Sequence, residues 1–274
     1  SMKKLKLIRR LILLLIVFGL FFTAYYTYAI SPNDYTFSTY NYVNKDVTSA
    51  LNGFKIAYIS DTNLTDKESV SRLKKMIDKL NSYPFDMVIF GGDLYDGAIV
   101  ESKDVSAALK SIECKYGKFA ILGEKDNSSS LEVTQILNDG GFEVLENTAR
   151  TIHYKEASFL LLACHQDTDI SSLKGDTKTI KIGITHQPDS FQNHKGKLDL
   201  QLSGHSYGGS IYIPYYGALL APDNAKIYNH GIYEESNSVL LVSNGFHGPA
   251  SFPYKFLARN EINFITLNTS SNSQ

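Results

Sequence analysis

The hydrophobic pattern divides the chain into one long apolar segment near its start and a larger region of short apolar runs. The long segment extends from Leu11 to Ile30 and is long enough to span a bilayer as a helix. Five basic residues precede it and three tyrosines lie at its end: Lys3, Lys4, Lys6, Arg9, Arg10, Tyr25, Tyr26 and Tyr28. Because basic flanks stay in the cytoplasm and tyrosines collect at membrane interfaces, the pattern predicts a single-pass anchor in the cell membrane at 11–30. Residues 1–10 are then a cytoplasmic basic segment, and the part that follows the anchor is extracytoplasmic.

A cleaved signal peptide is the alternative explanation of this segment. The apolar run is long for a signal peptide, and Thr27-Tyr28-Ala29 is only a weak match to a cleavage site. We therefore favour an uncleaved anchor. Ser1, which precedes Met2, is interpreted as the remnant of a tag.

After a polar segment at 31–53, which predicts a stalk or linker with a lead-in strand, strand-like and helix-like patterns alternate. Short apolar runs typical of buried strands occupy 54–60, 87–90 and 118–123. Apolar residues at helical spacing occupy 68–80, 104–112 and 131–141, and Gly140 with Gly141 predicts the end of the third helix. This order is typical of an open α/β sheet, in which ligands bind at the carboxyl ends of the strands.

The second half of the chain is richer in strands. Runs of β type, separated by turn residues, occupy 151–154, 158–164, 179–186, 198–204, 238–245 and 262–267, with a helix-like turn at 189–194. The pattern as a whole predicts one α/β domain at 54–268, in which two sheets pack face to face with helices outside. A flexible tail is expected at 269–274.

Composition and charge argue against several classes of protein. The 274 residues include 27 basic and 28 acidic side chains, a net charge of −1, so we expect no nucleic-acid partner held by broad electrostatic attraction. Cys114 and Cys164 have neither the spacing of a zinc knuckle nor that of a disulfide framework. Both are interpreted as small buried side chains.

Polar residues follow the predicted strands at five places. They lie in SDTN (60–63), GGDLYD (91–96), GEKDN (123–127), GITHQPD (183–189) and SGHSYGG (203–209). A charged group directly after a buried strand costs too much free energy to be structural filler unless it is paired or binds a metal. Carboxylates that bridge two metals, with imidazoles as nitrogen ligands, can clamp a phosphoryl group and activate a water.

The order and spacing of these motifs resemble the calcineurin-like metallophosphoesterases, whose motifs run DxH, GDxxD, GN(H/D), H and GHxH. The resemblance covers 54–267. GITHQPDSF, LDLQLSGHSYGGSIYIPYYGALLAP and NEINFITLN are further similar to a membrane-anchored bacterial subgroup. The resemblance implies an α/β fold, a four-layer sandwich of two mixed β-sheets flanked by helices, with a dinuclear metal site.

This chain keeps five of the family's functional positions and departs at four. The matching residues are Asp61, the bridging Asp93, the supporting Asp96, His186 and His205. The departures are Asn63 for a histidine, Glu124 for an asparagine, Lys125 for the phosphate-contacting histidine and Tyr207 for the last histidine.

The departures fall unevenly on the two metal positions that the resemblance implies. The better site consists of Asp93, Glu124, His186 and His205, a donor set that suits one divalent transition metal such as Mn, Zn or Fe. The degraded site, with Asp61, Asn63, Asp93 and Tyr207, has lost both imidazoles, so it is expected to be empty or to bind a second metal only weakly. Lys125 is a candidate to supply part of the positive charge that the second metal would have carried.

Each of these residues also has a structural interpretation. Asp61 and Asp93 could be turn or capping residues, and His186 and His205 ordinary buried histidines. Glu124 could be an ion-pair partner of Lys125 or His186. Packing is the favoured interpretation of Tyr207, a turn that of Asn63, and a surface or structural position that of the loop residues His165 and His247. The run YIPYYGALLAP is either a surface for a partner or for lipid, or, as we favour, a buried packed loop.

Two functions of different class follow from the sequence. The favoured one is a catalytically impaired or inactive pseudoenzyme, held at the membrane, that acts as a binding or scaffold module in the cell envelope. The alternative is an active phosphodiesterase or pyrophosphatase that uses one tight metal on an envelope or lipid-linked phosphoester. Expected partners are the membrane, an envelope protein, and a phosphorylated lipid or nucleotide-like ligand.

Overall fold

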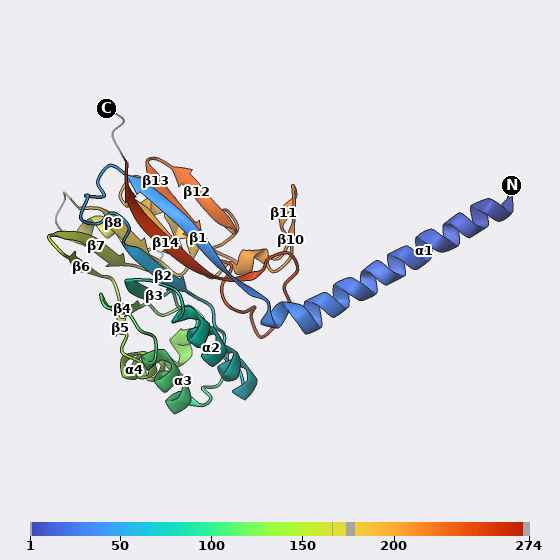
Figure 1. Ribbon diagram of the computed structural model, residues 1–274, viewed down its shortest axis with the longest axis horizontal. Coiled ribbons are helices and arrows are strands. Elements are labelled where there is room, and N and C mark those ends of the chain that lie inside the picture. Colours follow the sequence, from blue (N-terminus) through green and yellow to red (C-terminus); the bar gives the residue numbers. More distant parts are fainter. Residues whose placement is uncertain (1, 166, 174–178, 271–274) are drawn as a thin grey trace.

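The computed structural model describes residues 2–165, 167–173 and 179–270, so Ser1 and most of the tail predicted at 269–274 lie outside the described residues. Figure 1 shows an α/β domain from which one long helix, α1 (Met2–Tyr25), projects into open space. No residue of α1 is buried. A π-helical turn (Tyr26–Ile30) and a 3-10 turn (Ser31–Asn33) connect α1 to the domain. Within the described residues this is the one helix that is long and apolar enough to cross a membrane.

The first of two six-stranded sheets has the order β1-β14-β2-β3-β4-β5. Its strands are β1 (Tyr35–Asn44), β2 (Lys55–Ile59), β3 (Met87–Phe90), β4 (Lys118–Ala120), β5 (Glu143–Val144) and β14 (Asn260–Thr269). The strands β2 to β5 run parallel, β14 is antiparallel to β2, and β1 is parallel to β14. The sheet is therefore mixed, and the apolar runs that the sequence predicts as buried strands form its centre.

The second six-stranded sheet has the order β12-β13-β9-β8-β7-β6. Its strands are β6 (Thr148–Tyr154), β7 (Ala157–Ala163), β8 (Lys181–Ile184), β9 (Leu200–Ser203), β12 (Gly231–Glu235) and β13 (Ser238–Val242). The strands β7, β8, β9 and β13 run parallel, and β6 and β12 are antiparallel edges. A separate two-stranded hairpin is formed by β10 (Tyr212–Ile213) and β11 (Gly217–Ala218).

The outer layers differ in thickness. Three helices, α2 (Lys67–Leu80), α3 (Ser102–Lys110) and α4 (Ser130–Asp139), cover the outer face of the first sheet (Figure 1). The outer face of the second sheet is covered by α5 (Phe191–His194), 3-10 turns at Ile170–Ser172 and Pro188–Ser190, and loops. Asp66 caps α2 by accepting a hydrogen bond from the backbone N–H of Ser69 at 2.8 Å, and α4 ends immediately before Gly140.

The predicted four-layer α/β sandwich of two mixed sheets is confirmed. The predicted helices all form, each within a few residues of its expected bounds. The sequence predicts that the segment 31–53 is a stalk with a lead-in strand. Its strand, β1, is part of the first sheet, because it pairs with β14 along its whole length. The prediction of a buried packed loop for YIPYYGALLAP is wrong, because Tyr215 and Tyr216 are exposed to solvent, as are Leu219 and Leu220.

Packing between the two sheets provides the first testable prediction. Phe159 on β7 is fully buried, and its ring centroid lies 5.4 Å from that of Phe54 in an edge-on contact. We expect Phe159→Ala to lower the free energy of unfolding by about 3–5 kcal/mol through lost burial and a cavity between the sheets. Urea unfolding of the full chain in detergent measures the effect. Leu131→Ala, at a position 88% exposed, is the control and should change stability little; a similar loss in both variants would contradict the prediction.

Candidate metal centre

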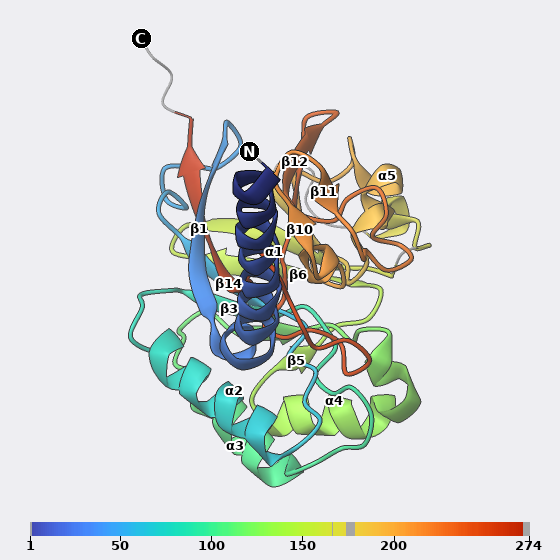
Figure 2. The same ribbon diagram turned by 90° about the vertical axis from the view of Figure 1, so that its right-hand side faces the viewer.

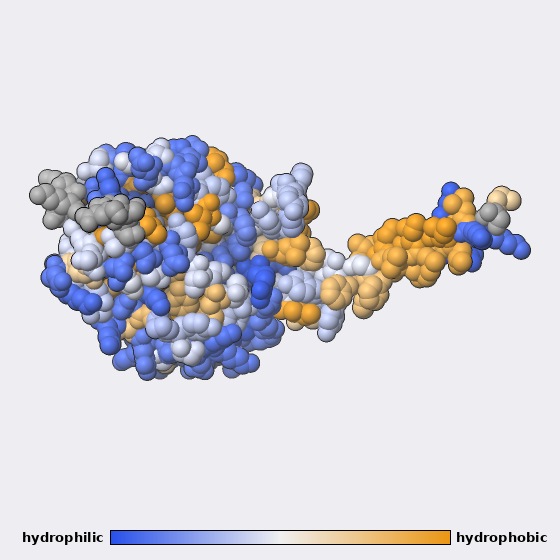
Figure 3. Space-filling view, turned by 45° about the horizontal axis from the view of Figure 1, so that its top comes forward, coloured by the Kyte–Doolittle hydropathy of each residue, from blue (hydrophilic) through white to orange (hydrophobic). Residues whose placement is uncertain are grey.

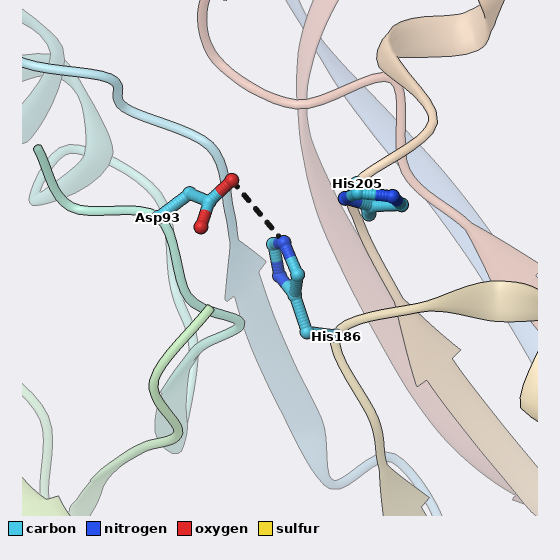
Figure 4. Close-up of side chains that lie close together, drawn as sticks. All are labelled: Asp93, His186 and His205. Carbon is cyan, nitrogen blue, oxygen red and sulfur yellow. Dashed lines mark ion pairs between the residues drawn. The ribbon is translucent and has the colours of Figure 1, made fainter. Parts of the chain in front are cut away.

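Three potential metal ligands meet where the two sheets face each other. Asp93 follows β3 in the first sheet, whereas His186 and His205 follow β8 and β9 in the second. One ligand atom of each lies within 4.8 Å of the others (Figure 4). All three are buried, with 0%, 6% and 5% of their surface exposed. The carboxyl ends of parallel strands from two sheets thus bring together residues that are far apart in the sequence.

The two imidazoles are oriented so that each has one nitrogen free for a metal. His186 Nδ1 lies 2.7 Å from the backbone oxygen of Gly91, and His205 Nε2 lies 2.8 Å from that of Asp223. A nitrogen that faces a carbonyl oxygen must donate, which leaves the opposite ring nitrogen as the acceptor or metal ligand. Those opposite atoms, His186 Nε2 and His205 Nδ1, are buried and make no hydrogen bond. Buried polar atoms without partners are rare, so this donor set fits a divalent transition metal.

Electrostatics at this point favour a cation. His186 Nε2 lies 3.2 Å from Asp93 Oδ2, an ion pair without hydrogen-bond geometry. Burial opposes charge on both groups, but the attraction between them outweighs it. This attraction raises the pKa of His186 to about 10 and lowers the pKa of Asp93 to about 2. The pair therefore attracts positive charge to this position, whether a proton or a metal.

The backbone around the centre is held in an unfavourable conformation. Five non-glycine residues of the strand-end loops have a positive φ: Asp61, Asn63, Asp93, His205 and Tyr207. A left-handed conformation costs an L-residue about 1–2 kcal/mol. Glycines allow the loops to approach closely, since a Cβ at Gly204 would lie 2.4 Å from Asp61 Oδ2. Strain of this kind, gathered at one point of the fold, is typical of functional sites.

The other half of the predicted dinuclear site has a different chemistry. Asp61 is fully buried, and its carboxylate accepts hydrogen bonds from the backbone N–H of His205 at 3.0 and 3.2 Å. The Tyr207 hydroxyl donates to Asp93 Oδ2 at 3.5 Å. Burial and the nearby Asp61 and Asp93 carboxylates raise the pKa of Tyr207 far above its usual range. Tyr207 therefore stays protonated and acts as a donor, which makes it a poor metal ligand.

Lys125 lies within this second half. Its ammonium donates to Asn63 Oδ1 at 3.1 Å and to Asp96 Oδ2 at 2.5 Å, and it lies 5.2 Å from the centroid of the Tyr207 ring. Asn63, Asp96 and Tyr207 thus contact a side-chain cation. The backbone N–H of Lys125 also donates to Asp93 Oδ1 at 3.0 Å, which ties this residue to both halves of the site.

The chain is similar to several curated metallophosphoesterases. An uncharacterized metallophosphoesterase of Bacillus subtilis, YkuE, is 27% identical over 237 residues, which cover 82% of this chain and 82% of that protein. The phosphodiesterase YaeI of Escherichia coli is 26% identical over 190 residues, 65% of this chain and 70% of that protein. The chain is a relative of the metallophosphoesterases.

Other matches cover a smaller share of the relative or have a lower sequence identity. A transmembrane protein with a metallophosphoesterase domain from Danio rerio is 22% identical, and the match covers 80% of this chain but 54% of that protein. The match to a Helicobacter pylori metallophosphoesterase covers 58% of that relative. The solved phosphopantetheinyl hydrolase of Mycobacterium tuberculosis superimposes with a TM-score of 0.45 at 8% identity, over 71% of this chain and 91% of that one. No family model matches the chain.

Glu124 lies apart from the three clustered ligands of this metallophosphoesterase relative. Its side chain is exposed and accepts a hydrogen bond from Gln187 Nε2 at 3.0 Å. Asp96, the supporting residue, binds Lys125 and also accepts from the backbone N–H of Ala250 at 2.6 Å. The structure thus brings together Asp93, His186 and His205 directly, and places Glu124 at the rim.

Two buried charged residues were not singled out from the sequence. The Asp126 carboxylate accepts hydrogen bonds from the backbone N–H groups of Asp93, Leu94 and Gly123 at 2.8–3.0 Å. Lys255 is 1% exposed and donates to the backbone oxygens of Asn244 and Gly245; burial lowers its pKa to about 7. Asp126 lies in the GEKDN motif and could have been found from that position, whereas nothing around Lys255 in the sequence marks it.

A cavity of about 370 Å³ opens beside His186. Glu124 and Asn127 line it from the first sheet's side, and His186 and Gln187 line it from the second. Its lining is polar as well as apolar. A cavity of mixed polar and apolar lining next to a candidate metal centre is where a ligand would be expected to bind.

Asp126 provides a prediction about the support of this centre. Asp126→Ala leaves three buried N–H groups without an acceptor, so we expect the free energy of unfolding to fall by about 2 kcal/mol or more. Bound metal should also fall, because the loop that carries Asp93 is no longer held. Denaturant unfolding and elemental mass spectrometry measure the two effects. The exposed Asp78→Ala is the matched control, and equal results for the two variants would refute the assigned role.

Proposed function

We propose that this metallophosphoesterase relative binds one divalent transition metal and a phosphorylated ligand, and that it is a catalytically impaired pseudoenzyme of the cell envelope. In this proposal α1 anchors the protein in the cell membrane with its domain on the extracytoplasmic side, where it acts as a binding or scaffold module. The metal is held by Asp93, His186 and His205, with Glu124 as a further candidate ligand from the rim.

The observation that carries the proposal is the position of the Lys125 ammonium. It hydrogen-bonds to Asn63 and Asp96 beside Tyr207, within the half of the site that would hold a second metal. A second cation at this point would be repelled by the ammonium, and the ligands there offer no imidazole. One metal and one ammonium can bind a phosphate group, but they lack the two-metal clamp that holds attacking and leaving oxygens together.

The neighbouring groups support binding more than turnover. A bound metal would polarise a phosphoryl oxygen and lower the pKa of a water. The Lys125 ammonium is hydrogen-bonded to Asn63 and Asp96, so it neutralises negative charge at the site instead of passing a proton to the ligand. The Tyr207 hydroxyl stays protonated and donates a hydrogen bond to Asp93, which holds the carboxylate in place. The cavity beside His186 offers room for the ligand.

An active enzyme is the second candidate, and one observation favours it. The three residues Asp93, His186 and His205 form a buried cluster in which His186 Nε2 and His205 Nδ1 make no hydrogen bond, as a working metal site requires. In this case the substrate is a phosphodiester or pyrophosphate of the envelope, and catalysis proceeds with one tight metal.

The metal stoichiometry tests the shared part of both candidates. The full chain, purified without chelator and offered Mn, Zn, Fe and Mg, should retain about one transition metal in elemental mass spectrometry. His205→Ala should lose it, whereas His153→Ala, an exposed position on β6, should keep it. If no metal is retained under any condition, the metal centre is refuted. Two tightly held metals would show that Lys125 does not replace the second one.

Restoring the family's residues tests the impairment itself. We expect the triple variant Asn63→His, Lys125→His and Tyr207→His to bind a second metal. Its turnover of a generic phosphodiester should rise by about 100-fold or more, because a positioned proton donor alone contributes roughly 10²–10⁴-fold. The gain should vanish when Asp93→Asn is added. If the unchanged chain already hydrolyses the diester, and Asp93→Asn abolishes that activity, the active enzyme is the correct candidate.

A further inference from the structure

The β10–β11 hairpin exposes an apolar surface that the site chemistry does not explain. Its large exposed side chains are Ile213, Tyr215, Tyr216, Leu219 and Leu220, with 41%, 109%, 77%, 44% and 50% of their surface accessible. From Ser210 to Pro222 the chain contains no charged side chain. Such a run on a surface is unusual for a domain surrounded by water on all sides and marks a site of contact.

This hairpin is joined to a second exposed segment, Phe252–Leu257. The backbone N–H of Tyr212 donates to the Phe256 oxygen at 3.0 Å, and the N–H of Phe256 donates to the Ser210 oxygen at 2.9 Å. Phe252 and Leu257 are themselves exposed, at 37% and 49%. Only the two ends of this segment are exposed, since Lys255 within it is buried. We call the exposed side chains of the two segments (Ile213, Tyr215, Tyr216, Leu219, Leu220, Phe252 and Leu257) the hairpin surface.

The hairpin surface lies beside the base of α1. The rings of Tyr26 and Phe256 contact each other edge-on at 6.1 Å, and those of Tyr28 and Tyr254 lie 5.9 Å apart. Figures 1 and 2 both show β10 and β11 on the side of the domain from which α1 leaves. Figure 3 shows apolar surface of the domain next to the base of the helix.

The junction between helix and domain is held by polar contacts as well. Arg259 forms an ion pair with Asp34 at 2.8 Å, and Asn260 Nδ2 donates to the Ser31 oxygen at 2.9 Å. A helix held in this way orients the domain that follows it. Whatever lies beside its base is then held at the membrane surface.

We propose that the hairpin surface docks into the interface of the bilayer that α1 spans, with the tyrosines at the headgroups and the leucines below them. This inference rests on the proposed membrane anchorage by α1. Tyrosine favours the membrane interface because its ring is apolar and its hydroxyl is wet, and leucine favours the acyl region. The absence of charge from Ser210 to Pro222 removes the main cost of entering that layer.

Docking would also place the candidate metal centre near the lipid headgroups. The uncharged run from Ser210 to Pro222, which contains the hairpin, starts three residues after Tyr207. It ends at the residue before Asp223, whose backbone oxygen accepts a hydrogen bond from His205 Nε2 at 2.8 Å. The backbone N–H of Leu220 donates to the Gly209 oxygen at 3.0 Å, which closes the hairpin at the end of the loop that carries His205 and Tyr207. The phosphorylated ligand of the centre is therefore one presented at the membrane surface.

A single tryptophan can test this, because the chain contains none. Tyr215→Trp, as full chain in lipid vesicles, should emit at shorter wavelength than in water. It should also be quenched by lipids brominated near the headgroup end of their chains. Leu131→Trp on α4, on the far side of the domain, is the matched control and should behave as in water.

Two further measurements separate the possible failures. Phe18→Trp, within α1, should be quenched by lipids brominated near the bilayer centre; if it is not, the anchorage and the inference that rests on it both fail. If Phe18→Trp is quenched and Tyr215→Trp is not, the hairpin docking alone is refuted. Blue-shifted emission of Tyr215→Trp without quenching, lost at one chain per lipid nanodisc, would show that a second copy covers the surface and would also overturn the proposal.

Adding Leu219→Glu and Leu220→Glu to Tyr215→Trp should abolish the quenching.

Discussion

Two carboxylates, Asp61 and Asp93, are fully buried where the two sheets meet, and the organisation of the centre follows from their need for positive charge. A buried carboxylate without a counter-charge is too costly to persist. The His186 imidazole pairs with Asp93, the Lys125 ammonium binds Asp96 beside it, and the buried Lys255 raises the positive potential around Asp61. The strained strand-end loops and the Asp126 carboxylate hold these groups in place.

The two halves of the centre meet that need in different ways. One half keeps two imidazoles whose inward ring nitrogens make no hydrogen bond, and such nitrogens are suited to bind a metal. The other half has a protonated tyrosine and a lysine, so the chain's own side chains supply hydrogen-bond donors and positive charge there. A fold shared with hydrolases does not by itself imply hydrolysis. In the function proposed above, the centre holds a phosphorylated group, and the absence of the two-metal arrangement is what limits it to binding.

The α1 helix and the hairpin surface lie on the same side of the domain, and the hairpin is connected to a loop of the metal centre. α1 is joined to the domain by aromatic contacts and by the Arg259–Asp34 ion pair, instead of by a loose stalk. The hairpin surface beside it extends from the same loop that carries His205 and Tyr207. Under the two proposals made above, membrane location and ligand binding are coupled through a few residues. The orientation of the domain on the bilayer would then also decide what reaches the metal centre.

The sequence by itself determined the anchor-like helix, the alternation of strands and helices, and the grouping of Asp93, His186 and His205. Hydrophobic periodicity is local, so the helices and strands can be inferred from spacing. The grouping of the three ligands is implied by the resemblance of the motifs to a known family. Only the tertiary structure decided which partners Lys125 takes, that Asp126 supports the Asp93 loop, that Lys255 is buried, and that β1 joins the sheet. It also showed the hairpin exposed where the sequence predicts a packed loop. Each of these depends on contacts between residues far apart in the chain, and an apolar run has the same pattern whether a core or a membrane covers it.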